Sequence, residues 1–142
     1  MTTIIRTCVF SLLAWSLISG SVYAADLMQI EVKLDGAQCT PPVNTKANGL
    51  AQLSLNKESG EISGMITLKN IDAKKAHIHY GETGKGGKVL VNLEKSDAGT
   101  FVVPDFTTLA KADVDTLLKG GMYLQVHTAQ YPKGELRGQI MP

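Results

Sequence analysis

Short segments in which apolar and polar residues alternate dominate the chain beyond its first 25 residues. Alternation with a period of two places every second side chain on the same face, which is typical of a half-buried β-strand. Turn residues rich in Gly, Pro, Asn and Asp separate the segments, and two adjacent pairs form apparent hairpins around 57–60 and 131–133. The segments with this pattern are 28–34, 50–56, 61–68, 76–80, 88–93, 100–103, 122–128 and 134–140.

One segment has a different period. Residues 107–118 place Leu109, Ala112 and Leu117 at helical spacing, and Gly120 and Gly121 follow as a helix stop. Together with the alternating segments, this predicts an all-β fold: an antiparallel Greek-key sandwich or barrel of about eight strands with one short helical insertion.

The N-terminus has the features of a secretory signal peptide. Arg6 precedes an uncharged apolar run over 8–18, and small residues lead to Val22 and Ala24 at the positions that a signal peptidase reads. We therefore expect residues 1–24 to be a signal peptide and residues 25–142 to be the mature domain, in the periplasm or outside the cell. The alternative is a buried N-terminal helix. The run is short for a bilayer span and no second run follows, so we expect no membrane anchor once the signal is removed.

Charge and composition narrow the choice of partner. The chain has 14 Lys+Arg and 13 Asp+Glu, and loss of Arg6 with the signal leaves 13 of each sign. A neutral domain lacks the excess of positive charge that binding to nucleic acid or to an anionic membrane surface requires. Only 6% of residues are aromatic, so we do not expect a surface on which bases or sugars stack. The mature domain keeps one cysteine, Cys39, so it has no pair for an internal disulfide. This thiol is either buried, a metal ligand or linked to a partner.

The histidines are the strongest chemical signal. His77 and His79 are two residues apart in one expected strand, so their rings project from the same face about 7 Å apart. His127 lies in a later strand, on the face opposite to the apolar residues there. If the two strands adjoin, the three imidazoles form a site suited to copper, zinc or nickel. The alternative is that all three are ordinary solvated surface residues.

Other sequence features carry less chemistry. The glycine-rich segment 81–88 resembles a phosphate loop, but a strand follows it instead of a helix, so we expect a flexible connection beside the histidine pair. Glu135 and Arg137 share the outer face of the last strand. They are expected either to orient an imidazole or to form an exposed cross-strand ion pair.

Several motifs resemble the chordin-type (CHRD) domain. The resemblance rests on Ala-His-Ile-His-Tyr-Gly at 76–81, Val-His-Thr at 126–128 and Gly-Glu-Leu-Arg-Gly-Gln at 134–139, and it extends from about 29 to 141. The domain is named for repeats in a secreted growth-factor antagonist and is also widespread as a stand-alone exported bacterial module; the resemblance implies the stand-alone form for this chain. Family members often have a Gly-Pro turn after the histidine pair, where this chain has Tyr80-Gly81-Glu82.

A weaker likeness concerns copper–zinc superoxide dismutase, which also places a His-x-His strand on the outside of a Greek-key barrel. Matched in that way, His77, His79 and His127 would stand at three of its four copper ligands. The bridging histidine, the zinc-ligand loop and the structural disulfide have no counterpart, so the likeness does not imply fast dismutation.

The sequence thus predicts an exported CHRD-domain protein that binds a transition metal, with copper favoured, through His77, His79 and His127. Its expected role is metal handling rather than turnover. Water, Cys39 or Met122 are candidates for further coordination positions. Two other functions stay open: a metal-free interaction module for a secreted or envelope protein, and a copper-dependent redox enzyme.

Overall fold

The computed structural model describes residues 26–142, and the predicted signal peptide lies outside these residues. Nine strands and one helix make up the described part. They are β1 (Leu27–Leu34), β2 (Asn48–Asn56), β3 (Ile62–Lys69), β4 (Ala73–Tyr80), β5 (Val89–Asn92), β6 (Glu94–Asp97), β7 (Thr100–Val102), α1 (Lys111–Leu118), β8 (Met122–Thr128) and β9 (Leu136–Ile140).

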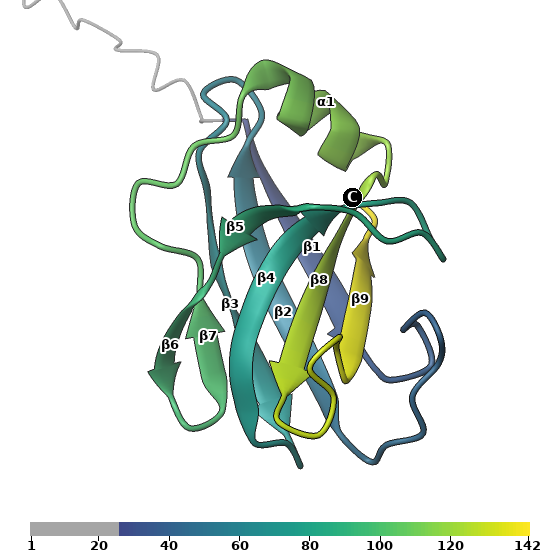
Figure 1. The fold of residues 1–142 in the computed structure, drawn as a ribbon. Coiled ribbons are helices and arrows are strands. Elements are labelled where there is room, and N and C mark those ends of the chain that lie inside the picture. The colour runs from purple at the N-terminus through teal and green to yellow at the C-terminus, as the bar shows by residue number, and fades with distance from the viewer. Residues whose placement is uncertain (1–25) are drawn as a thin grey trace, which may run out of the picture.

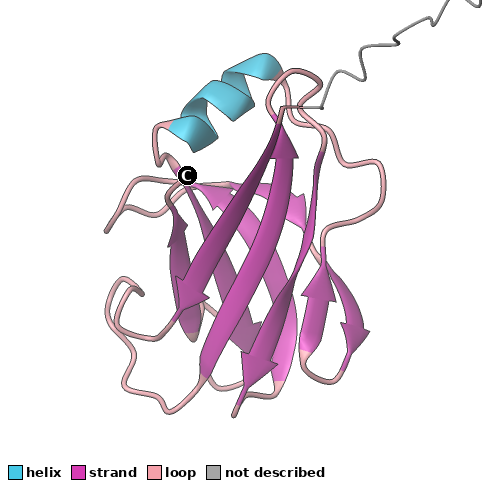
Figure 2. Ribbon diagram, turned by 180° about the vertical axis from the view of Figure 1, so that it is seen from behind, coloured by secondary structure: helices cyan, strands magenta, loops and turns pink. Residues whose placement is uncertain are grey.

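The strands form two sheets packed face to face. One sheet has the order β1-β2-β3-β7-β6 and the other has the order β5-β4-β8-β9 (Figure 1). Seen from behind, the first sheet lies in front of the second (Figure 2). Every strand pair is antiparallel, and the pairs β3–β7 and β4–β8 join strands that are distant in the chain. These findings confirm the all-β antiparallel sandwich, whereas the alternative of a closed barrel is wrong.

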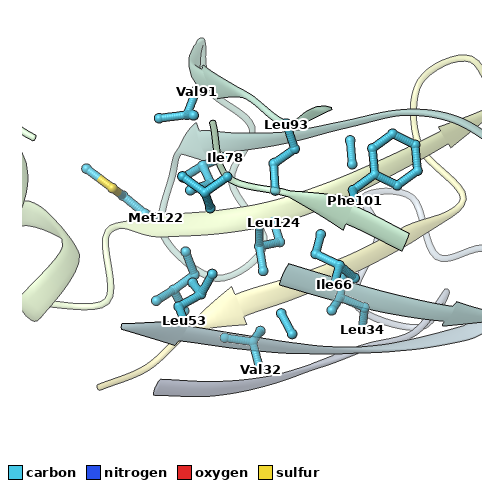
Figure 3. Packing of buried hydrophobic residues seen from close by; sticks show 14 of the residues in the cluster. Val32, Leu34, Leu53, Ile66, Ile78, Val91, Leu93, Phe101, Met122 and Leu124 are labelled. Carbon is cyan, nitrogen blue, oxygen red and sulfur yellow. The ribbon is translucent and has the colours of Figure 1, made fainter. Parts of the chain in front are cut away.

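The core lies between the two sheets and follows the predicted alternation. Leu53 and Ile66 point inward from one sheet, and Ile78 and Leu124 point inward from the other (Figure 3). Phe101 is among the largest of the fully buried side chains. Burial of such a side chain contributes about 1.5–3 kcal/mol, so the alternating apolar residues hold β4 and β8 firmly in register.

The helical insertion is shorter than predicted. Residues 107–109 are extended and pair with the turn between β2 and β3: Ile62 donates its N–H to the Thr107 carbonyl, and Leu109 donates to the Gly60 carbonyl. These backbone bonds compete with the first helical turn, so α1 begins only at Lys111. The helix lies across one end of the sandwich (Figure 1) and buries Val114 and Leu117.

Strand β6 was not predicted from the sequence. All four of its residues, Glu94–Asp97, are exposed and polar, so they lack the alternation that marks a half-buried strand. The strand forms at the sheet edge because β7 supplies a pairing partner. No helix in residues 26–142 is long and apolar enough to span a membrane.

Candidate metal centre

Pairing of β4 with β8 brings the three histidines together. His77 lies opposite Gln125 in this register and His79 lies opposite Tyr123, so His127 is a diagonal neighbour of His77. One ligand nitrogen from each ring lies within 4.8 Å of the other two. In the described residues this is the single group of three or more potential ligands found so close together. The condition that the sequence left open is therefore met: the two strands adjoin, and His77, His79 and His127 lie together.

Backbone carbonyls fix the orientation of two of the rings. His127 donates from Nδ1 to the Pro132 carbonyl at 3.0 Å, and His79 donates from Nδ1 to the Gly87 carbonyl at 3.0 Å. A carbonyl accepts a hydrogen bond and cannot donate one, so each of these Nδ1 atoms carries the ring proton. The Nε2 atom is then the nitrogen left to act as an acceptor or a metal ligand: in His127 it accepts a hydrogen bond from Nδ1 of His77, and in His79 it faces no partner.

Two of the three ring nitrogens, those of His77 and His127, have the spacing that a shared metal ion needs. The Nδ1 atom of His77 lies 3.1 Å from Nε2 of His127. Two nitrogens bound to one ion at about 2.0–2.1 Å are separated by roughly 2.9–3.4 Å at angles between 90° and 110°. The Nε2 atom of His79 is buried and has no hydrogen-bond partner. A metal ion would take the place of the hydrogen bond between His77 and His127, with the Nδ1 proton of His77 moving to Nε2 of the same ring, and it would also give the Nε2 atom of His79 a partner.

The electrostatics of the cluster favour neutral imidazoles. Burial lowers the pKa of His77 to about 4, and the neighbouring His127 and His79 rings lower it further as they become cationic. Burial also lowers the pKa of His127, although its bond to the Pro132 carbonyl acts in the opposite direction. The His77 ring therefore stays neutral, and able to bind a metal, at pH values well below neutrality, and the shift at His127 acts in the same direction.

Loops cover the outer face of this sheet, so the residues there are more buried than the sequence suggested. His79 is 8% exposed, Tyr123 is 3% exposed and Arg137 is 2% exposed. The Tyr123 ring stacks on His79 with 5.0 Å between ring centroids, and the Arg137 guanidinium lies 3.7 Å from the Tyr123 centroid on its π-face. The site is therefore a partly enclosed cleft, contrary to the alternative of three solvated surface histidines.

Glu135 and Arg137 do not form the ion pair that was one of the two expectations. The Glu135 carboxylate accepts hydrogen bonds from the hydroxyls of Thr45 and Thr128 at 2.7 and 2.8 Å. The Arg137 guanidinium instead donates to the carbonyls of Lys85 and Glu82. Glu135 therefore binds two threonine hydroxyls, whereas Arg137 binds the loop between β4 and β5.

The two sulfur candidates lie outside the cluster. Cys39 is a free, buried cysteine that is 5% exposed, and burial raises the pKa of its thiol. Met122 is fully buried in the hydrophobic core. The cluster of histidines does not include Cys39, and Met122 faces the core rather than the outer face, so a fourth coordination position on a bound metal would be left for water or another small ligand.

A cleft gives access to that position. It is lined in part by His79, His127, Thr40 and Lys133, and it adjoins an apolar groove between the loop around Cys39 and the β8–β9 turn. Three imidazole nitrogens with one open position could bind a metal ion and admit a small ligand to it.

The sequence did not reveal the groups that orient the rings. The acceptors at Gly87 and Pro132 are backbone carbonyls, and such acceptors have no residue signature. The period of two places Tyr123 on the same face of β8 as His127, but its stacking on His79 depends on cross-strand register. The glycine-rich segment was expected beside the histidine pair, and its Gly87 carbonyl does contact His79.

Comparison with known proteins supports the resemblance seen in the sequence. No curated protein and no solved structure matches the chain. The family model of the CHRD domain matches residues 30–140, which include every strand from β2 to β9 and all three histidines. The chain therefore belongs to the CHRD domain family.

Proposed function

We propose that this protein is an exported metal-binding protein that holds one transition-metal ion, preferably copper, through His77, His79 and His127. The observation that carries the proposal is the buried, unpartnered Nε2 atom of His79 beside two other imidazole nitrogens. An unsatisfied buried nitrogen destabilises a fold by about 1–3 kcal/mol. A bound metal ion gives that nitrogen a partner.

The donor chemistry supports copper among the candidate metals. Imidazole nitrogens bind copper, zinc and nickel, and affinity for divalent ions is highest for copper in the usual order of stability. The predicted signal peptide supports a location outside the cytoplasm. The cluster contains no carboxylate and no thiolate, so the three ligands carry no formal charge and can accept either Cu(I) or Cu(II).

The experiment is a metal titration of the mature protein, residues 25–142, prepared without a histidine tag. This chain contains every described strand and all of the described core. Competition with chromophoric chelators measures the affinities for Cu(I), Cu(II) and Zn(II), beside a variant with all three histidines replaced by alanine. A Cys39→Ser variant is the matched control, because its thiol lies outside the cluster.

We expect one copper ion per chain with a sub-micromolar Kd, loss of binding in the triple variant and no change in the Cys39→Ser variant. Weak binding that survives the three substitutions would overturn the proposal. The apolar groove beside the β8–β9 turn would then favour the other candidate, an interaction module for a secreted or envelope protein.

A further inference from the structure

We propose that Arg137 is a positioning residue of the metal centre: it holds the 81–87 loop so that His79 keeps its Nδ1 proton and presents Nε2 to the metal. This inference rests on the proposed function for the identity of the ligand. Its structural content, a fixed His79 tautomer, is a property of the metal-free protein and can be measured in it.

The first step is the contact between Arg137 and the loop. From β9, the guanidinium donates to the carbonyl of Lys85 at 2.9 Å and to the carbonyl of Glu82 at 2.8 Å. It also donates to the side-chain carbonyl of Gln139 at 2.9 Å. Both backbone carbonyls belong to the loop between β4 and β5. One planar guanidinium, with its parallel N–H donors as a fork, therefore fixes the path of this loop at two points.

The second step runs from the loop to the histidine. The Gly87 carbonyl accepts the Nδ1 proton of His79, and the Gly87 N–H donates to the Tyr123 hydroxyl at 3.3 Å. A side chain at Gly87 would place its Cβ 1.9 Å from the Tyr80 carbonyl oxygen, so only glycine fits this path. The position of one carbonyl therefore depends on a loop that Arg137 holds.

The third step is a stack of planar groups across three strands. The Arg137 guanidinium lies on one face of Tyr123 at 3.7 Å, and the His79 ring lies nearly parallel to Tyr123, with an angle of 11° between the two planes. Cation–π contact favours this placement of the guanidinium. The stack limits rotation of the imidazole, while the Gly87 carbonyl decides which of its nitrogens is protonated.

The charge on Arg137 also points to this role. The side chain is 2% exposed, yet none of the ion pairs in the described residues includes it. Burying an unpaired guanidinium is unfavourable unless carbonyl groups solvate it. The guanidinium donates to two carbonyls of the 81–87 loop and to the side-chain carbonyl of Gln139. Its charge is therefore stabilised by the loop beside His79 and not by a carboxylate.

The test is the ¹⁵N NMR spectrum of the imidazoles in the metal-free mature protein, since this spectrum distinguishes protonated from unprotonated ring nitrogens. The variants are Arg137→Met, which removes the fork, and Arg137→Lys, which keeps a charge and an aliphatic stem but loses the two parallel bonds. Lys133→Gln is the matched control, because it removes an exposed charge from the same cleft.

In the wild-type and Lys133→Gln proteins we expect His79 to be protonated on Nδ1 alone. In both Arg137 variants we expect a mixture of tautomers, together with a loss of copper affinity of about 10- to 100-fold. If Arg137→Met does not fold, Arg137→Lys alone decides the outcome.

An unchanged His79 tautomer in a folded Arg137 variant would overturn the inference. Because the tautomer is read without metal, this failure is distinct from failure of the proposed function, which would appear as a wild-type protein that binds no copper.

Discussion

Replacing His79 with phenylalanine should stabilise the metal-free protein, although the residue is buried. Phenylalanine retains a planar ring that can stack on Tyr123, and it removes the Nε2 atom that has no partner in the fold. Most substitutions of buried residues destabilise a protein. The opposite sign at His79 would show that this residue is kept for binding at the expense of stability.

The magnitude follows from two opposing changes. Removing the unsatisfied Nε2 atom relieves a penalty of about 1–3 kcal/mol. Losing the Nδ1 bond to Gly87 costs about 1 kcal/mol, since Gly87 is exposed and water can solvate its carbonyl. The net expectation is a gain of about 1 kcal/mol, which corresponds to roughly 4 °C in Tm for a domain of this size.

The assay is urea unfolding of the mature proteins in the presence of a metal chelator, repeated with copper in excess. The control is His127→Phe, because both nitrogens of His127 have partners, and we expect this variant to lose about 1–2 kcal/mol. Copper at 100 times its Kd should stabilise wild type by about 2.7 kcal/mol and should have little effect on His79→Phe. The order of stability therefore reverses when copper is added.

A His79→Phe protein that is less stable than wild type by more than about 1 kcal/mol in chelator would refute this reasoning. That result would mean that the imidazole contributes to the metal-free fold and that its orphaned nitrogen has no energetic consequence.

Three further predictions test the loop, the protonation of the cluster and the core. Gly87→Ala should lower copper affinity about 10- to 100-fold in chelator competition, because the new Cβ displaces the loop from Tyr80; unchanged affinity would show that the loop does not orient the ligand. The depressed pKa values of His77 (about 4) and His127 mean that the unfolded chain binds more protons than the folded chain as the pH falls below their ordinary value of 6.5. The free energy of unfolding of the metal-free protein should therefore decrease from pH 6.5 to about 4, and a His77→Phe variant with the same decrease would contradict this origin. Leu124→Ala, at a fully buried position, should destabilise the fold by about 2–5 kcal/mol in urea unfolding; a change below 1 kcal/mol would argue against the packing described.

The periodicity of the sequence was sufficient to predict the inner face of the sandwich. Ile78 and Leu124 alternate with polar neighbours, and both are buried as that alternation requires. The same period places the three histidines on the opposite face. The three rings lie close together because β4 pairs with β8. Alternation cannot reveal such pairing between distant strands, so the sequence alone left the site conditional on it.

The outer face was harder to predict because loops decide its burial. Arg137 has the sequence context of an exposed strand residue, yet the 81–87 loop covers it. Edge strand β6 is not predicted by the sequence, because all four of its residues are exposed and polar and therefore show no alternation of apolar and polar positions. Backbone acceptors such as the Pro132 carbonyl depend on the path of the chain and are not encoded by a residue type.

The central claim is that one copper ion binds to nitrogen atoms of His77, His79 and His127. The most direct measurement is the ¹⁵N NMR spectrum of the mature protein after one equivalent of Cu(I), which is diamagnetic. We predict large shifts at Nε2 of His79 and His127 and at Nδ1 of His77, with the Nδ1 protons of His79 and His127 retained. Copper that binds while these imidazole shifts stay unchanged, through the Cys39 thiol or the N-terminal amine, would contradict the account.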